Sequence, residues 1–354
     1  MMENKRILLV GHTMDRGGAS HVLSILANSF SEKGWEVELA FLRIRNAYDI
    51  SGKINLIALC QPEEKVGFLK AYRKLKRLYR NTNAAVIISF LLPINFITIL
   101  ATRGLRKKII ISERNDPKEA SYRWLFLLSK ILYPIADYCV FQTERVKGYY
   151  SSKCRAKSSI IMNPLDITSF PQKEKYDQNS LVAVGKLWPQ KNHLLLIDAF
   201  YVFSKMHNDY TLKIYGEGPL RKNIEDRINK MNLANKVFLM GNKPDIIKRI
   251  VNEGVFVLTS DYEGLSNALL EAMCVGMPCI STKCAGADEI IKDGSNGILV
   301  DVGNKDQLVH AMELMAYDIS IRKRLGAKAI KFRNKCSADF VVEEWINIIE
   351  KVTK

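Results

Sequence analysis

The 354-residue sequence lacks the features that mark several common classes of protein. Its 7 cysteines include no Cys-x-x-Cys pair, so we expect buried, reduced thiols and neither a zinc site nor a disulfide framework. No Asp-x-Asp pair is present to hold a divalent metal, and neither a metal nor a cofactor is expected. The uncharged stretch that ends at Thr102 contains Pro93 and Asn95, which favours buried strand and helix over a membrane span.

Two signatures of other protein classes are also missing. Residues 1–6 lead straight into an apolar, strand-like run without the charged-then-apolar pattern of a secretion signal, so we expect a cytoplasmic protein. The loop from Gly11 to Gly18 does not match G-x-G-x-x-G, the fingerprint of dinucleotide binding. This absence argues against a nicotinamide-dependent oxidoreductase.

Acidic residues are scarce in the first half of the chain. The whole sequence carries 53 Lys and Arg against 37 Asp and Glu, a net charge of +16. Residues 1–170 hold 27 of these cations and 14 of the acids, whereas residues 171–354 hold 26 and 23. The first half is therefore expected to face an anionic partner. A basic nucleic-acid-binding protein is one alternative, but no nucleic-acid-binding motif accompanies the charge.

Segment 65–80 concentrates this charge, with seven cations and no acid. Its larger apolar residues recur at helical spacing on one face: Phe68, Tyr72, Leu75 and Tyr79. One interpretation is a basic amphipathic helix that lies on an anionic membrane surface. The other is a helix packed by its apolar stripe, with a solvated basic back. The charge asymmetry of the chain favours the membrane.

Strand-like and helix-like stretches alternate along the whole chain, which is typical of parallel sheets covered by helices on both faces. Expected strands in the first half are 6–10, 35–41, 86–89, 108–112, 138–141 and 159–162. Asn163-Pro164 and the polar stretch 172–180 predict a domain junction. The predicted fold is α/β, with two doubly wound Rossmann-like domains at residues 1–164 and 165–336. An amphipathic helix is expected over 337–354.

The segment 261–273 (DYEGLSNALLEAM) is the most informative of the chain. It follows an apolar, β-branched strand, and Ser266 or Asn267 can cap a helix that runs to about Val275. Glu263 then lies on the loop and Glu271 about one and a half turns into the helix. A helix N-terminus attracts phosphate, and two flanking carboxylates accept hydrogen bonds from sugar hydroxyls. The pattern suits a nucleotide-sugar; the alternative is two ordinary solvated glutamates.

Further strand-then-glycine units support the first interpretation. A strand from Leu181 ends at Gly185, and the loop that follows carries Lys186 and Lys191, close enough to hold one diphosphate. Segment 211–221 repeats the design, with Pro219 expected in the first turn of a helix. A further strand ends at Gly241-Asn242.

The motifs VGKLWPQKN, YGEGPLR and EGLSNALLEAMCVGMPCIST together resemble the C-terminal domain of retaining GT-B glycosyltransferases of family four, the group 1 type. The first loop, from His12 to Leu23 with its Gly17-Gly18 pair, is similar to that family's glycine-rich loop. The resemblance covers nearly the whole chain. It implies two domains facing across a cleft, the first binding acceptor and the second binding donor, with the helix 337–354 crossing back onto the first.

The resemblance also implies roles for single residues. Glu271 would bind the ribose hydroxyls and Glu263 the hydroxyls of the donor sugar. The diphosphate would be held by Lys186, Lys191 and the backbone N–H groups of Leu265, Ser266 and Asn267. Catalysis is expected from Glu263, Lys191 and Lys186, and the remaining donor-site positions are Gly264, Gly185, Gly241 and Asn242. Lysine replaces the family's usual arginine at position 186, so the bidentate fork is lost.

Two further places are expected to contact diphosphate, donor sugar or acceptor. The Gly17-Gly18 turn allows close backbone approach, although a simple helix-entry turn is the alternative. After the strand 108–112 many relatives carry histidine, whereas this chain has Glu113 and Arg114. The alternative for this pair is an interdomain or intraloop ion pair.

The expected function is the metal-independent, retaining transfer of a hexose or N-acetylhexosamine from a nucleotide-sugar to a glycan acceptor. UDP is the expected nucleotide, with GDP left open, and the acceptor is expected to be a polyprenyl diphosphate-linked glycan. The narrower resemblance is to bacterial surface-polysaccharide assembly, at the inner face of the cell membrane, with the basic first domain on the anionic lipid surface. No nucleic-acid partner is expected. A non-catalytic nucleotide-sugar-binding protein on the same fold is the remaining alternative.

Overall fold

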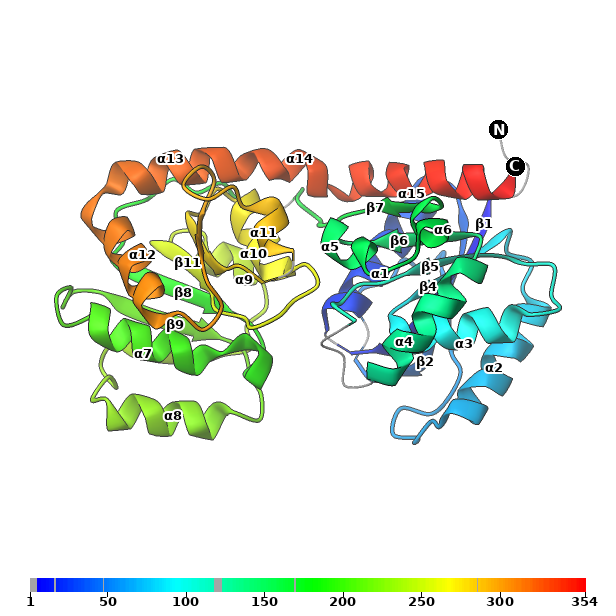
Figure 1. Cartoon of the computed structure of the whole chain (residues 1–354), viewed down its shortest axis with the longest axis horizontal. Helices are drawn as coiled ribbons and strands as arrows, with labels where there is room; N and C mark the ends of the chain where they lie inside the picture. The colour runs from blue at the N-terminus through cyan, green and yellow to red at the C-terminus, as the bar shows by residue number, and fades with distance from the viewer. Residues whose placement is uncertain (1–4, 16, 47, 118–122, 169, 285) are drawn as a thin grey trace. The chain divides into compact units, whose positions relative to one another are not determined.

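The computed structural model describes residues 5–15, 17–46, 48–117, 123–168, 170–284 and 286–354. The chain divides into two compact units (Figure 1). The first comprises Met1–Asp166 with Ser337–Lys354, and the second Ile167–Cys336. Each is built on one parallel sheet, of seven and six strands, which confirms the predicted α/β class with two Rossmann-like sheets.

The first sheet has the strand order β3-β2-β1-β4-β5-β6-β7, and every pairing is parallel. The strands are β1 (Arg6–Met14), β2 (Glu36–Ile44), β3 (Asn55–Ala58), β4 (Val86–Phe90), β5 (Lys108–Ser112), β6 (Tyr138–Phe141) and β7 (Ser158–Ile160). Central strands such as β4 are buried along their whole length, as parallel strands covered on both faces must be. The order reverses between β1 and β4, so the sheet is doubly wound.

Helices cover both faces of this sheet. On one face lie α1 (Gly18–Glu32) and α15 (Ala338–Thr353), against Ile7 and Leu9 of β1. On the other lie α2 (Phe68–Asn81), α3 (Leu92–Thr102) and α4 (Arg123–Leu132), against Leu8 and Val10. Shorter segments are η1 (Tyr133–Ile135), α5 (Glu144–Gly148) and α6 (Ser152–Arg155). The alternation of side chains along β1 therefore supplies two separate cores.

The C-terminal helix α15 belongs to the core of the first unit. Ser337 caps its N-terminus by accepting a hydrogen bond from the backbone N–H of Phe340, at 3.2 Å. Trp345 is fully buried and stacks on Phe90 of β4, with ring centroids 5.9 Å apart. An indole this size buries a large apolar area, so the helix is firmly anchored on its sheet.

The second sheet has the order β10-β9-β8-β11-β12-β13, again all parallel. Its strands are β8 (Ser180–Val184), β9 (Thr211–Tyr215), β10 (Val237–Gly241), β11 (Val255–Leu258), β12 (Cys279–Thr282) and β13 (Ile298–Val300). Its helices are α7 (His193–Phe203), α8 (Arg221–Lys230), α9 (Ile246–Ile250), α10 (Asn267–Cys274), α11 (Ala287–Ile290), α12 (Lys305–Tyr317), α13 (Ile319–Ala329) and α14 (Arg333–Cys336), with the turns η2 (Pro189–Lys191) and η3 (Ile330–Phe332).

Some predicted details need adjustment. Pro219 lies two residues before α8 and not in its first turn, because Leu220 donates its backbone N–H to the Leu187 carbonyl of the neighbouring loop, at 3.1 Å. The helix predicted within 65–80 forms as α2, which buries Leu75 and Tyr79 but leaves Phe68 47% exposed. No described helix combines the length and the apolar content needed to cross a bilayer.

Candidate active site

The predicted donor residues lie at the carboxyl edge of the second sheet. The strand order reverses between β8 and β11, which are paired at the centre of the sheet. In open α/β sheets, ligands bind beyond the carboxyl ends of the strands at such a reversal. The loop 185–192 follows β8, and the loop 259–266 follows β11. These two loops carry most of the predicted donor-site residues.

Three glycines bring the ends of β8, β9 and β10 together. The N–H of Gly216 donates to the carbonyl of Gly241, at 3.0 Å, and the N–H of Gly185 donates to that of Tyr215, at 2.9 Å. Gly216 has a φ of 142°, and a Cβ there would overlap the Gly185 carbonyl. Only glycine fits this close backbone approach. Of the predicted donor positions, Gly185 and Gly241 are thus linked through Gly216, which the sequence analysis did not single out.

Hydrogen bonds join the loop after β8 to the loop after β11. Asn192 adopts a left-handed conformation, with a φ of 45°, and caps α7 by accepting from the N–H of Leu195. Its side-chain amide also donates to the Asp261 carboxylate, at 2.8 Å. The Thr259 hydroxyl donates to the carbonyl of Lys191, at 3.0 Å. The position of Lys191 is therefore fixed from both loops.

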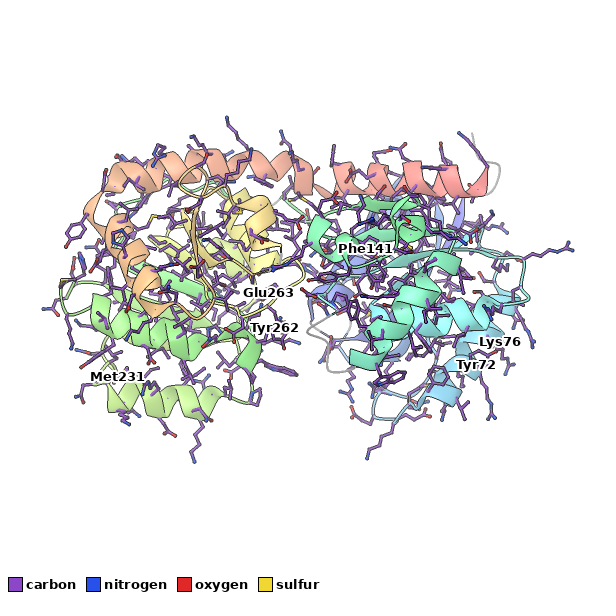
Figure 2. The ribbon with its side chains drawn as sticks, in the orientation of Figure 1. Tyr72, Lys76, Phe141, Met231, Tyr262 and Glu263 are labelled. Carbon is purple, nitrogen blue, oxygen red and sulfur yellow. The ribbon has the colours of Figure 1, made fainter. Side chains whose placement is uncertain are left out.

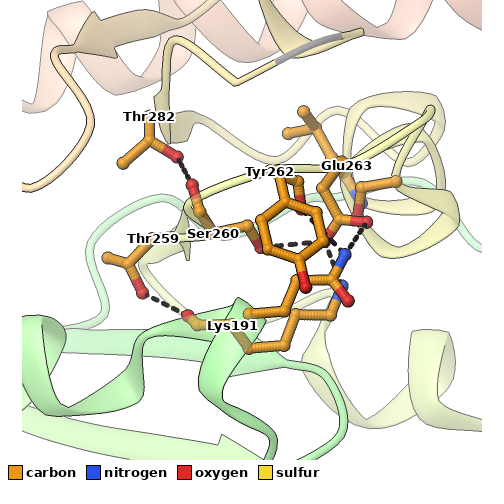
Figure 3. A network of polar contacts seen from close by, with 9 residues as sticks. Lys191, Thr259, Ser260, Tyr262, Glu263 and Thr282 are labelled. Atoms are coloured by element: carbon orange, nitrogen blue, oxygen red, sulfur yellow. Dashed lines mark hydrogen bonds and ion pairs between the residues drawn. The ribbon is translucent and has the colours of Figure 1, made fainter. Parts of the chain in front are cut away.

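At the centre of these loops Lys191 Nζ forms an ion pair with Glu263 Oε1 (Figures 2 and 3). The Ser260 hydroxyl donates to the same oxygen, at 2.8 Å. The Gln190 amide donates to the Tyr262 carbonyl, at 2.8 Å, and to Glu263 Oε2, at 3.4 Å. Glu263 is only 9% exposed, so these donors replace the water that a buried carboxylate loses.

The helix α10 begins directly after this cluster. Ser266 is its N-cap and accepts from the N–H of Leu269, at 3.5 Å, which settles the predicted choice between Ser266 and Asn267. Gly286, with a φ of 86°, packs its backbone against the carbonyl of Gly264 and leaves no room for a Cβ. The first N–H groups of a helix have no partner within it and carry partial positive charge. Glu263 and Lys191 therefore lie beside a helix terminus suited to an anion.

Glu271 lies within α10 and is half-buried. Loss of hydration raises the pKa of its carboxyl to about 7. Within the described residues, no side-chain hydrogen bond or ion pair involves this carboxyl group. Lys186 is exposed, with its ammonium 5.9 Å from the centre of the Trp188 ring, and Asn242 is exposed beyond β10. These three side chains lie outside the Lys191–Glu263 cluster.

The Gly17-Gly18 pair lies in the first unit, at the end of β1. Gly17 is the N-cap of α1, and Gly18 is its first residue. The Gly17 carbonyl accepts from the hydroxyls of Ser20, at 3.0 Å, and Tyr48, at 3.4 Å. Arg16, which belongs to the predicted glycine-rich loop, falls outside the described residues. A role for the pair in binding diphosphate or acceptor stays a prediction.

Glu113 and Arg114 follow β5 and point to opposite faces of the first sheet. Glu113 accepts a hydrogen bond from the Tyr133 hydroxyl, at 2.8 Å, and burial raises the pKa of its carboxyl to about 7. Arg114 extends towards α15, with its guanidinium 5.0 Å from the Phe90 ring centre and 5.6 Å from that of Trp345. No ion pair joins the two side chains among the contacts of the described residues.

Arg114 is held by several acceptors in the interior. Its Nε donates to the Ser112 hydroxyl, at 2.8 Å, and Nη1 to the Ile161 carbonyl and the Asn163 amide oxygen, at 3.0 and 3.2 Å. It is 5% exposed, and burial lowers the pKa of its guanidinium to about 9. Its contact with donor or acceptor stays a prediction, because everything it touches here belongs to the scaffold.

Sequence reasoning missed four polar residues of the donor-site cluster. Gln190 and Asn192 flank Lys191, and Thr259 and Ser260 directly follow β11. Polar residues directly beyond a buried strand are the available signal for such positions. No group of three or more His, Cys, Asp and Glu side chains in the described ranges is placed to hold a metal.

Two parallel Rossmann-like sheets, with the second unit carrying this loop cluster, define the GT-B fold of glycosyltransferases. Sucrose-phosphate synthase from Thermosynechococcus elongatus superposes with a TM-score of 0.86 over 98% of both chains, at 15% identity. The family described as "Glycosyl transferases group 1" matches residues 166–332. The chain belongs to this family and is a hexosyltransferase.

Two relatives carry assigned activities. An N-acetylgalactosamine-N,N'-diacetylbacillosaminyl-diphospho-undecaprenol 4-alpha-N-acetylgalactosaminyltransferase of Campylobacter jejuni subsp. jejuni is 28% identical over 341 residues, 90% of this chain and 92% of its own. A UDP-Gal:alpha-D-GlcNAc-diphosphoundecaprenol alpha-1,3-galactosyltransferase of Escherichia coli is 31% identical over 213 residues, 56% of this chain and 52% of its own.

Proposed function

We propose that this glycosyltransferase moves a hexose or N-acetylhexosamine from a UDP-sugar to a polyprenyl diphosphate-linked glycan, with retention at the anomeric carbon, in surface-polysaccharide assembly. The observation that carries the proposal is the Lys191–Glu263 pair beside the N-terminus of α10. The names of the Campylobacter and Escherichia relatives support it, since both specify a diphospho-undecaprenol-linked acceptor and the second specifies UDP-galactose.

In this proposal the diphosphate takes over Lys191 from Glu263. A nucleotide diphosphate is a stronger anion than one carboxylate, so Lys191 Nζ turns to its oxygens, together with the N–H groups at the start of α10. Glu263 then accepts hydrogen bonds from donor-sugar hydroxyls, while Ser260 and Gln190 hold its orientation. A cation fixed at the leaving diphosphate stabilises the charge that develops there when the glycosidic bond breaks.

Glu271 is the proposed partner of the ribose hydroxyls. Its carboxyl is desolvated, with a pKa near 7, and two donating hydroxyls would stabilise its ionised form. Lys186 is exposed on the same loop as Lys191 and supplies a second point charge for the diphosphate. Residues 165–336 are thus assigned to the donor and residues 1–164 to the acceptor.

The acceptor assignment matches the charge of the first unit. A polyprenyl diphosphate carries two phosphates at a membrane surface, and the exposed cations of α2 provide complementary charge. We place the reaction at the cytoplasmic face of the cell membrane, with the protein peripheral to the bilayer. The acceptor diphosphate and anionic lipids would compete for these cations.

A thermal-shift screen of UDP-, GDP- and ADP-sugars, without added metal, tests the donor site. We expect stabilisation by the UDP series in the wild type and its loss in Glu271→Ala. Transfer from the stabilising UDP-sugar to an undecaprenyl diphosphate-linked glycan should then follow. Stabilisation by no nucleotide-sugar, with or without such an acceptor, would refute the donor assignment.

A further inference from the structure

The helix α4 carries apolar side chains on both of its faces. Leu125 and Phe126 face inward and are buried, each 7% exposed. Its outer face and the turn after it expose large apolar side chains, which we call the α4 stripe: Trp124, Leu127, Leu128, Ile131 and Ile135, at 56%, 62%, 37%, 69% and 46% exposure. Four of these recur at i, i+3, i+4 and i+7, one face of a helix. Scattered exposed apolar residues are ordinary, but a continuous stripe marks an interaction surface.

The stripe lies in the same helix layer as the basic helix α2. Residues of α2, α3 and α4 share one core against the first sheet, and α3 contacts both of the others (Figure 1). The outward side of α2 exposes cations: Lys70, Arg73, Lys74, Arg77 and Arg80. At the start of α2, Leu69 is 65% exposed, and the Phe68 ring packs on Phe96 of α3. The layer therefore presents apolar side chains beside a dense positive charge.

We propose that this helix layer docks on a bilayer that contains anionic lipid, with the α4 stripe inserted among the acyl chains. The cations of α2 would lie at the headgroups, where they attract anionic lipid. Tryptophan, leucine and isoleucine on one helix face form the apolar side of an interfacial helix. Lys130 borders the stripe with its ammonium over the Phe126 ring, so its charge can reach the headgroup level while its stem stays apolar.

The charge of the layer favours a bilayer over a second copy of the chain. A symmetric dimer formed through the same surface would bring the cations of two α2 helices together, which like-charge repulsion opposes. An anionic bilayer supplies both complementary charge and an apolar interior. The inference deepens the proposed function, because a polyprenyl-linked acceptor resides in a membrane, but it uses no residue of the donor site.

Co-sedimentation of the whole chain with vesicles tests the proposal. Vesicles of phosphatidylcholine with 30% phosphatidylglycerol (roughly the anionic share of natural surfaces) are compared with phosphatidylcholine alone. We expect Leu127→Ser/Ile131→Ser to lower the partition coefficient about tenfold. The matched control is Met206→Ser/Val302→Ser, which removes exposed apolar residues of the second unit and should leave partitioning unchanged. Equal binding by wild type and the α4 variant would overturn the proposal.

Trp124 gives a direct readout of insertion. Phospholipids brominated on the acyl chains quench only an indole that enters the hydrocarbon region. We expect quenching in the wild type and its loss in Trp124→Phe, since Trp35 and Trp345 are buried in the core and Trp188 lies in the second unit. An unquenched Trp124 would overturn the proposal, as would a dimer in solution that Leu127→Ser/Ile131→Ser dissociates.

Failure of this inference can be told apart from failure of the proposed function. Stabilisation by UDP-sugars is measured without lipid, and the α4 variants should retain it, because they leave the second unit unchanged. Retained UDP stabilisation without vesicle binding would remove only the membrane surface. Vesicle binding through α4 without UDP stabilisation would remove only the donor assignment.

Discussion

The loops after β5 and β11 both place a glutamate beyond a buried strand, yet they use the nearby cation differently. After β11, Glu263 pairs with Lys191, which comes from a loop 72 residues earlier in the chain. After β5, Arg114 is adjacent to Glu113 in sequence but turns to the opposite face of the sheet and is held by scaffold acceptors. The same residue types therefore form a ligand site in one unit and a structural anchor in the other.

The difference follows from what each cation can exchange. Lys191 binds a carboxylate through one flexible ammonium, and an arriving phosphate can replace that carboxylate at little cost. Arg114 satisfies two backbone or amide acceptors and one hydroxyl at once, and its planar guanidinium stacks against Phe90 and Trp345. Moving it would leave several buried acceptors unpaired. An ion at a strand end is thus available for catalysis only where its partner is replaceable.

The largest effect should come from Arg114→Ala. Truncation leaves the Ile161 carbonyl and Asn163 without their donor and opens a cavity between Phe90 and Trp345. We expect the free energy of unfolding of the first unit to fall by about 3–5 kcal/mol. Chemical denaturation followed by tryptophan fluorescence measures this change. Arg106→Ala, at an exposed position of the same unit, is the control and should change stability by less than about 0.5 kcal/mol.

A small loss of stability in Arg114→Ala, combined with a large loss of transfer, would reverse the comparison. Arg114 would then act on a substrate and not as an anchor. The stability measurement needs no donor or acceptor, so it decides between these roles even if the true substrates differ from those proposed.

Lys191→Ala should show the opposite balance. Glu263 keeps the Ser260 and Gln190 donors, so we expect a stability loss of only about 1 kcal/mol. Removal of the cation from the leaving diphosphate should lower kcat about 100-fold or more. Steady-state transfer assays beside thermal unfolding separate the two effects. Lys222→Ala, on the exposed side of α8, serves as the matched lysine control, and an unchanged kcat in Lys191→Ala would contradict the proposed role.

The sequence predicts local parts of this comparison well and long-range parts poorly. The strand, glycine and capped helix from Val255 to Cys274 follow from periodicity and from Ser266, all within about twenty residues. The pairing of Lys191 with Glu263 depends on how two distant loops meet at the sheet edge. The inward turn of Arg114 likewise depends on acceptors near residue 161.

The α4 stripe is a third case. Its apolar residues recur at helical spacing, and that spacing alone does not say which side of an apolar helix meets the core. Only the placement of α4 beside α3 shows that Leu125 and Phe126 face inward and Ile131 outward. The basic stripe of α2 was visible in the sequence because charge marks the solvent side directly.

The smallest expected effect concerns the two carboxyls whose pKa burial raises to about 7, Glu271 and Glu113. The ordinary pKa of an unfolded glutamate is lower. Between that value and about 7 the folded protein therefore binds more protons than the unfolded chain. The stabilisation linked to each raised pKa is present at acid pH and lost as pH rises through about 7. Glu271→Gln and Glu113→Gln should each flatten this fall in the free energy of unfolding.

Donor binding should distinguish the two groups. Ribose hydroxyls that donate to Glu271 stabilise its ionised form, so UDP should release a proton on binding and bind about tenfold more weakly at pH 6 than at pH 8. Isothermal titration calorimetry in buffers of different ionisation enthalpy measures the release. Glu271→Gln should abolish the pH dependence, whereas Glu113→Gln should preserve it, because Glu113 is bonded to Tyr133 within the first unit. A pH-independent affinity in the wild type would exclude Glu271 as the ribose ligand.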